Sequence, residues 1–138
     1  MARSNELGAF ILRVFLGITF FVHGLTKFQG GIQNTAGFFE SLGLPGFTAY
    51  VVAIIELVGG LAMILGVGTR VVAILFAVIL AVATVKAKLA AGFLGNGQMA
   101  GYELDLALMV IAIYLAVAKK SLAALDNILF RSNETERN

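Results

Sequence analysis

The sequence predicts an all-α protein: an integral membrane four-helix bundle with both termini in the cytoplasm. Four apolar stretches, each about long enough to cross a bilayer, fill most of its 138 residues. Hydrophobic residues make up 59% of the chain and charged residues only 13%, against roughly 25% charged in soluble domains. Sixteen glycines suit transmembrane helices, in which small residues let backbones approach closely. We therefore expect a single multi-pass domain, residues 1–138, in a cell membrane.

The helices are expected at residues 6–28, 47–65, 69–91 and 101–118. Residues 29–46, rich in glycine and polar side chains, indicate an interfacial loop or a short amphipathic helix with its aromatics at headgroup level. Gly66 to Gly68 predicts a tight turn, and residues 92–101 a second loop. Residues 119–138 begin as an amphipathic continuation and end in a polar tail.

Basic residues predict the orientation. Four crossings put both termini on one side, and cytoplasmic flanks carry the excess of lysine and arginine. The side of the termini collects Arg3, Arg13, Arg70, Lys119, Lys120, Arg131 and Arg137. If that side is cytoplasmic, the outer third of the bundle holds His23, Lys27, Lys86, Lys88, Glu103 and Asp105.

Ionisable residues inside the apolar stretches predict a polar interior. A charged side chain in hydrocarbon costs roughly 2.5 to 3.5 kcal/mol on insertion scales, so these groups should face one another, water or a ligand. Arg13, Gly17, Gly24 and Lys27 share one helical stripe, and its two glycines would let another helix pack closely. We predict an intramembrane ion pair between Arg13 and Glu56, with structural and proton-handling or ligand-binding roles both open.

A ligand site is predicted from four residues. His23, the only histidine, borders the stripe one turn from Lys27. Glu103 shares a helical face with Tyr114, whereas Asp105 is displaced by about 200°. We expect His23, Lys27, Glu103 and Tyr114 to hold the ligand.

Asp105, Lys86 and Lys88 are expected outside this ligand site. Only one of Glu103 and Asp105 can point directly inward, and Lys86 and Lys88 have the same relation. One lysine and one carboxylate could line the interior while the other lysine and carboxylate reach the headgroups. For Lys86, Lys88 and Asp105 the pattern favours interfacial anchoring.

Composition limits the chemistry available to the chain. Without cysteine it has no disulfide, thiolate nucleophile, iron–sulfur ligand or Cys-based metal site, and one histidine cannot form a bis-histidine haem site. No metal site is expected, and no catalytic residue is assigned. A formal charge of +2 is too small to indicate nucleic-acid binding. Redox chemistry would need a bound cofactor or a partner.

Several motifs resemble the DoxX family. They are Arg13-Val-Phe-Leu-Gly17, Phe21-Val-His23-Gly24-Leu-Thr-Lys27-Phe28, Gly43-Leu-Pro45, Glu56-Leu-Val-Gly59-Gly60, Leu65-Gly66-Val-Gly68-Thr69-Arg70 and Gly101-Tyr-Glu103-Leu. In order, they cover nearly all of the chain. Within the family the chain is similar to small oxidoreductase-like members of Gram-positive bacteria. The resemblance implies a bacterial inner or plasma membrane, and it carries over the polar positions Arg13, His23, Lys27, Glu56 and Glu103.

The resemblance also implies an association with redox metabolism. Family members include subunits of quinol oxidase and thiosulfate:quinone oxidoreductase, and partners of thiol and superoxide defence. One function class is therefore a redox-associated protein that binds a quinone, or a membrane subunit of an oxidoreductase complex. The other is a non-enzymatic scaffold or a small-molecule transporter that uses the same polar cavity. The partners expected are the lipid bilayer, a soluble oxidoreductase and further copies of the chain.

Overall fold

The computed structural model describes residues 2–118 and 124–129, and its regular elements over these ranges are all helical. Within these described ranges, three segments are long and apolar enough to cross a membrane: Arg3–Gln29, Phe47–Leu65 and Thr69–Ala91. The elements are α1 (Ala2–Gln29), α2 (Ile32–Ser41), α3 (Phe47–Leu65), α4 (Thr69–Ala83), the π-helix η1 (Thr84–Lys88), the 3₁₀ helix η2 (Leu89–Ala91), α5 (Glu103–Val117) and α6 (Asp126–Leu129).

The observed bounds of the helices differ from the predicted ones by a few residues. Helix α3 spans the predicted residues 47–65, whereas α1 begins four residues before the predicted start at Glu6. The predicted helix 69–91 changes from α to π and then to 3₁₀ geometry, and α5 lies within the predicted range 101–118. Helix α2 lies in residues 29–46, where a loop or a short amphipathic helix was expected. Much of the predicted tail lies outside the described residues. It includes four of the basic residues that predict the orientation, Lys119, Lys120, Arg131 and Arg137.

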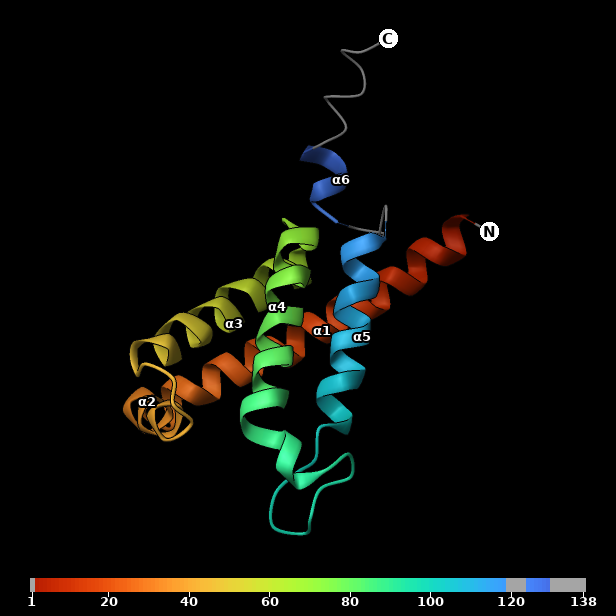
Figure 1. Cartoon of the computed structure of the whole chain (residues 1–138). Helices are drawn as coiled ribbons and strands as arrows, with labels where there is room; N and C mark the ends of the chain where they lie inside the picture. Colours follow the sequence, from red (N-terminus) through yellow and green to blue (C-terminus); the bar gives the residue numbers. More distant parts are fainter. Residues whose placement is uncertain (1, 119–123, 130–138) are drawn as a thin grey trace.

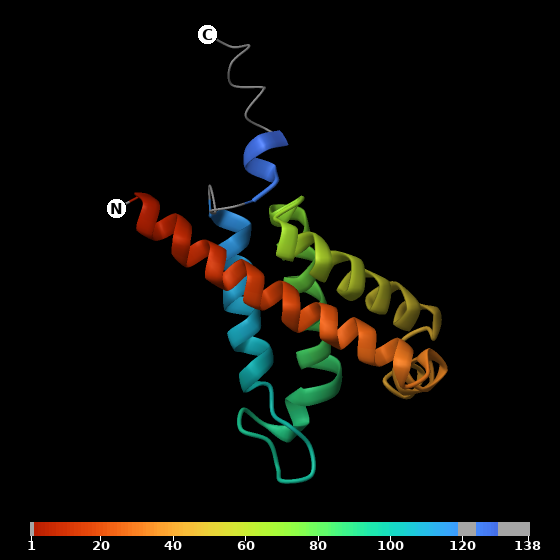
Figure 2. The same cartoon turned by 180° about the vertical axis from the view of Figure 1, so that it is seen from behind.

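Helices α1 and α3 pack side by side through backbone contacts at glycines (Figures 1 and 2). A Cβ added at Gly24 would lie 2.6 Å from the backbone nitrogen of Leu57, and one at Gly60 would lie 2.7 Å from the carbonyl oxygen of Gly17. Such distances leave no room for a methyl group, so these glycines fix the register of the two helices. The close approach expected at Gly17 and Gly24 is confirmed.

Helices α4 and α5 form a second pair, and a ring contact joins it to the first (Figure 1). Phe20 of α1 stacks on Phe76 of α4 with ring centroids 3.8 Å apart and planes 4° from parallel. Phe76 is fully buried, and a Cβ at Gly59 of α3 would lie 2.9 Å from its ring. The rings therefore hold the two pairs together in the core.

The turn between α3 and α4 depends on Gly66 and Gly68. Both have positive φ angles, 75° and 57°, which residues with a Cβ rarely adopt. The carboxylate of Asp126 in α6 accepts hydrogen bonds from the backbone N–H of Gly68 (2.8 Å) and of Thr69 (2.9 Å), so it caps the start of α4. The N–H of Leu125 also donates to the carbonyl of Leu65 (3.2 Å). Residues 124–129 are therefore docked on this turn.

Candidate functional site

A cavity of about 630 Å³ lies between the two helix pairs, within the usual size range of small-molecule sites. Figure 1 shows α3 and α4 diverging from the turn that joins them. Val51 of α3 and Val78 and Val82 of α4 line the cavity and remain about half exposed, so it is open where these helices diverge. Its walls are mainly apolar. Its titratable lining residues are His23, Lys27, Glu56, Lys86, Lys88 and Asp105.

The first polar group of the cavity is an ion pair between α1 and α3. The ammonium Nζ of Lys27 lies 2.9 Å from Oε1 and 3.0 Å from Oε2 of Glu56. The Glu56 side chain is 5% exposed and that of Lys27 is 22% exposed. Glu56 therefore pairs with Lys27 and not, as predicted, with Arg13. The glycine contacts align the helices so that Lys27 lies level with the middle of α3.

Arg13 lies near the opposite end of α3. Its side chain is fully buried, with Nη2 3.5 Å from the carbonyl oxygen of Ile64, and the guanidinium carbon lies 5.3 Å from the centroid of the Phe10 ring. It also interacts electrostatically with Asp126. A Cβ at Gly66 would lie 2.8 Å from Nη1. Arg13 thus belongs to the α3–α4 turn and α6, outside the cavity lining.

The second polar group is an ion pair between η1 and α5. Nζ of Lys88 lies 2.9 Å from Oδ1 of Asp105, whose side chain is 8% exposed. Lys88 is the last residue of the π turn, a geometry often found at functional sites. The sequence pattern favoured interfacial anchoring for Lys88 and Asp105, and the structure adds that the two residues pair with each other at the cavity wall.

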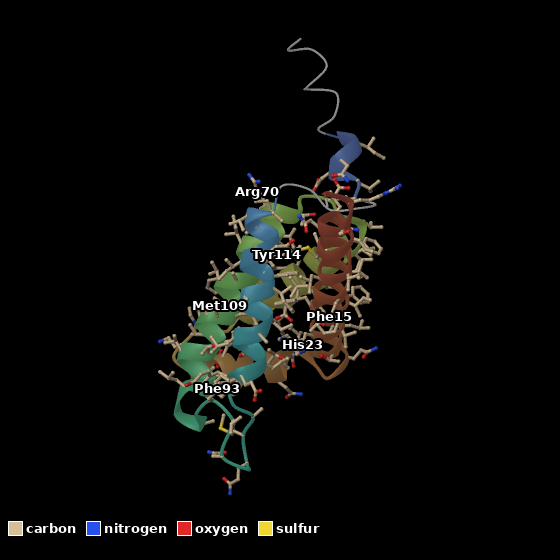
Figure 3. All side chains as sticks on the ribbon, turned by 90° about the vertical axis from the view of Figure 1, so that its right-hand side faces the viewer. Phe15, His23, Arg70, Phe93, Met109 and Tyr114 are labelled. Carbon is tan, nitrogen blue, oxygen red and sulfur yellow. The ribbon has the colours of Figure 1, made fainter. Side chains whose placement is uncertain are left out.

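Two predicted site residues lie outside the cavity lining. Glu103 is exposed in the first turn of α5, and Tyr114 is 39% exposed. Figure 3 shows Tyr114 toward the Arg70 end of the molecule, whereas His23 lies toward the Phe93 end. His23 and Lys27 do line the cavity, and the exposed Lys86 does so as well. Of the four predicted ligand residues, the structure brings together His23 and Lys27.

The sequence did carry a signal for the pair that was missed. Lys88 and Asp105 are 17 residues apart across one loop, and residues just before and after a short loop between antiparallel helices face each other. Phe38 and Phe39 of α2, which belong to the aromatics expected at headgroup level, also line the cavity. Over the described residues, no three His, Cys, Asp or Glu side chains gather as a metal site.

These features define a helical membrane protein with a charged cavity between two helix pairs. Residues 8–89 match the DoxX family, and the chain belongs to that family. The chain is 46% identical over 134 residues to "Putative oxidoreductase CatD" of Bacillus subtilis (strain 168), which covers 97% of this chain and 96% of the relative. It is 32% identical over 74 residues to "Inner membrane protein YqjF" of Escherichia coli (strain K12), covering 54% and 56%. No solved structure matches significantly.

Proposed function

We propose that this protein binds a quinone-like ligand in the cavity between its helix pairs and serves as the membrane component of an oxidoreductase system. The observation that carries the proposal is the presence of two lysine–carboxylate pairs, Lys27 with Glu56 and Lys88 with Asp105, in one largely apolar cavity. The name of the Bacillus subtilis relative adds support for an oxidoreductase role.

A lysine–carboxylate pair offers hydrogen-bond donors and acceptors side by side. The lysine ammonium can donate to the carbonyl oxygen of a quinone, and the carboxylate can accept from the hydroxyl of a quinol. The same pair can therefore bind both redox forms. Glu56 and Asp105 can also exchange protons with the ring oxygens, because a carboxylate at hydrogen-bonding distance is a suitable proton acceptor.

When bound, a quinone would accept two electrons and two protons and form a quinol. The chain has no cysteine, so we assign electron delivery to a soluble oxidoreductase that docks from outside. The contribution of this chain is then to bind the head, to hold it near Glu56 and Asp105, and to keep the tail in lipid. The opening at Val51, Val78 and Val82 suits such an apolar tail.

The membrane arrangement is part of the proposal. We propose that α1, α3, α4 with η1 and η2, and α5 with its flanking residues form four crossings in the cell membrane, with cytoplasmic termini. Helix α5 has 15 residues, about 22 Å in length, and needs its neighbours to reach a hydrocarbon thickness of about 30 Å.

The test is the binding of 2-methyl-1,4-naphthoquinone to the purified protein in phosphatidylcholine nanodiscs, measured by equilibrium dialysis. We expect Glu56→Gln and Asp105→Asn each to weaken binding about 10-fold. Each substitution removes a carboxylate that hydrogen-bonds the ligand and holds the neighbouring lysine in place. Glu103→Gln and Tyr114→Phe are matched controls outside the cavity, with changes expected to stay below about twofold.

Two results would contradict the proposal. One is no binding by the parent protein, and the other is equal binding by the parent and both cavity variants. In either case, solute flux in proteoliposomes would support a transporter function. If no solute crosses, a non-enzymatic scaffold is the remaining alternative.

A further inference from the structure

The charged side chains that line the cavity do not balance. Three lysines, Lys27, Lys86 and Lys88, stand against two carboxylates, Glu56 and Asp105. Each carboxylate already lies 2.9 Å from the ammonium of its lysine partner, Lys27 or Lys88. In the part of the chain that the structure describes, Lys86 forms no ion pair. With His23 counted as neutral, the lining carries one net positive charge.

We propose that the cavity selects a membrane-soluble aromatic ligand with a negatively charged head, and that Lys86 neutralises this charge. This inference rests on the proposed function and adds the charge of the ligand to it. Lys86 is exposed and, among the described residues, forms no ion pair, so its ammonium is accessible to a ligand head that enters the cavity. An anionic head compensates this charge, and a neutral carbonyl does so less well.

The position of Lys86 fits this role. It lies in the π turn two residues before Lys88, and both lysines line the cavity. Lys88 is fixed by Asp105, whereas Lys86 remains available to a ligand. The apolar residues at the opening, Val51 and Val78, favour a ligand whose charge is confined to one end.

Two probes separate charge from shape. 2-Hydroxy-1,4-naphthoquinone is ionised in neutral water, whereas 2-methyl-1,4-naphthoquinone has the same ring system and no charge. Both are measured by equilibrium dialysis against the protein in zwitterionic phosphatidylcholine nanodiscs. Because the two probes partition differently into lipid, the quantity compared is the change that Lys86→Gln causes in the binding of each probe.

We expect Lys86→Gln to weaken binding of the hydroxy probe about 5- to 10-fold and to change binding of the methyl probe less than about twofold. Lys86→Arg should keep the parent behaviour, because it keeps the charge. Arg70→Gln removes an exposed positive charge of α4 outside the cavity lining and should leave both probes unaffected.

Equal effects of Lys86→Gln on the two probes, or no effect on either, would overturn the inference while leaving the proposed function intact. If neither probe binds the parent, the proposed function fails as well. A lipid phosphate carries the same charge as the proposed head, so the dialysis is repeated in phosphatidylglycerol nanodiscs. If phosphatidylglycerol abolishes binding of the hydroxy probe to the parent but does not change its binding to Lys86→Gln, Lys86 binds lipid headgroups. That result would overturn the aromatic-ligand inference.

Discussion

Lys27 near the end of α1 and Glu56 in the middle of α3 form an ion pair at 2.9 Å, and both side chains line the cavity. The pair joins two helices that already touch through their glycines. Lys27 is partly exposed, whereas Glu56 is almost fully buried. Removing the lysine should therefore cost more stability than removing the carboxylate, because Glu56 would remain as an unpaired buried charge.

A double-mutant cycle tests this dependence. Lys27→Met leaves the Glu56 charge buried without its partner, so it should reduce the free energy of unfolding in detergent. Breaking a buried pair costs roughly 3 to 5 kcal/mol, and we expect a loss near the lower end of that range. Adding Glu56→Gln should recover part of that loss. Thermal unfolding of the parent, both single variants and the double variant measures the coupling.

The control cycle combines Arg13→Leu with Glu56→Gln. Since Arg13 lies near Ile64 and Asp126, its loss should add to that of Glu56 within about 0.5 kcal/mol. Coupling between Arg13 and Glu56, together with additivity between Lys27 and Glu56, would show that the pairing described here is wrong.

The glycine contacts between α1 and α3 give a second prediction. Gly24→Ala should destabilise the protein by roughly 1 to 3 kcal/mol, because its methyl group would meet the backbone of α3 and force the helices apart. Gly8→Ala is the matched control in the same helix, where a Cβ meets nothing within 4 Å. It should be neutral or stabilising by up to about 1 kcal/mol. Equal melting temperatures for the two variants would count against close packing at Gly24.

The cap on α4 gives a third prediction. Asp126→Ala should reduce stability by roughly 0.5 to 2 kcal/mol, because the backbone N–H groups of Gly68 and Thr69 lose their acceptor. Asp126→Asn, which keeps one acceptor oxygen, should lose less. Thermal unfolding in detergent measures both. A loss as large for Asn as for Ala would indicate that charge near Arg13, rather than capping, is the main contribution.

Membrane orientation gives a fourth prediction. Single cysteines at Asn34 and Asn96, both exposed, should react with a membrane-impermeant maleimide added to intact cells. A cysteine at the exposed Ser4 should react only after the cells are opened. The parent protein has no cysteine and serves as the blank. The reverse pattern would invert the proposed topology.

The sequence by itself indicated the helical membrane class of this protein and the bounds of α3, and it placed the ends of the other long helices to within about four residues. Long apolar stretches broken by glycine leave few alternatives to membrane helices, and the glycine spacing on α1 correctly indicated a close helix contact. It also placed His23 and Lys27 in the polar part of the molecule. These conclusions follow from properties that are local along the chain.

Only the tertiary structure decided which charges meet. The choice between Lys27 and Arg13 as partner of Glu56 depends on the register of α1 against α3, which the glycine contacts set and the connecting segment does not reveal. The choice between Glu103 and Asp105 depends on the rotation of α5, which carries apolar residues on all sides and so gives no periodicity to follow. Lys88 is the last residue of a π turn at the end of α4, a change of helical geometry that the apolar pattern of residues 69–91 does not reveal.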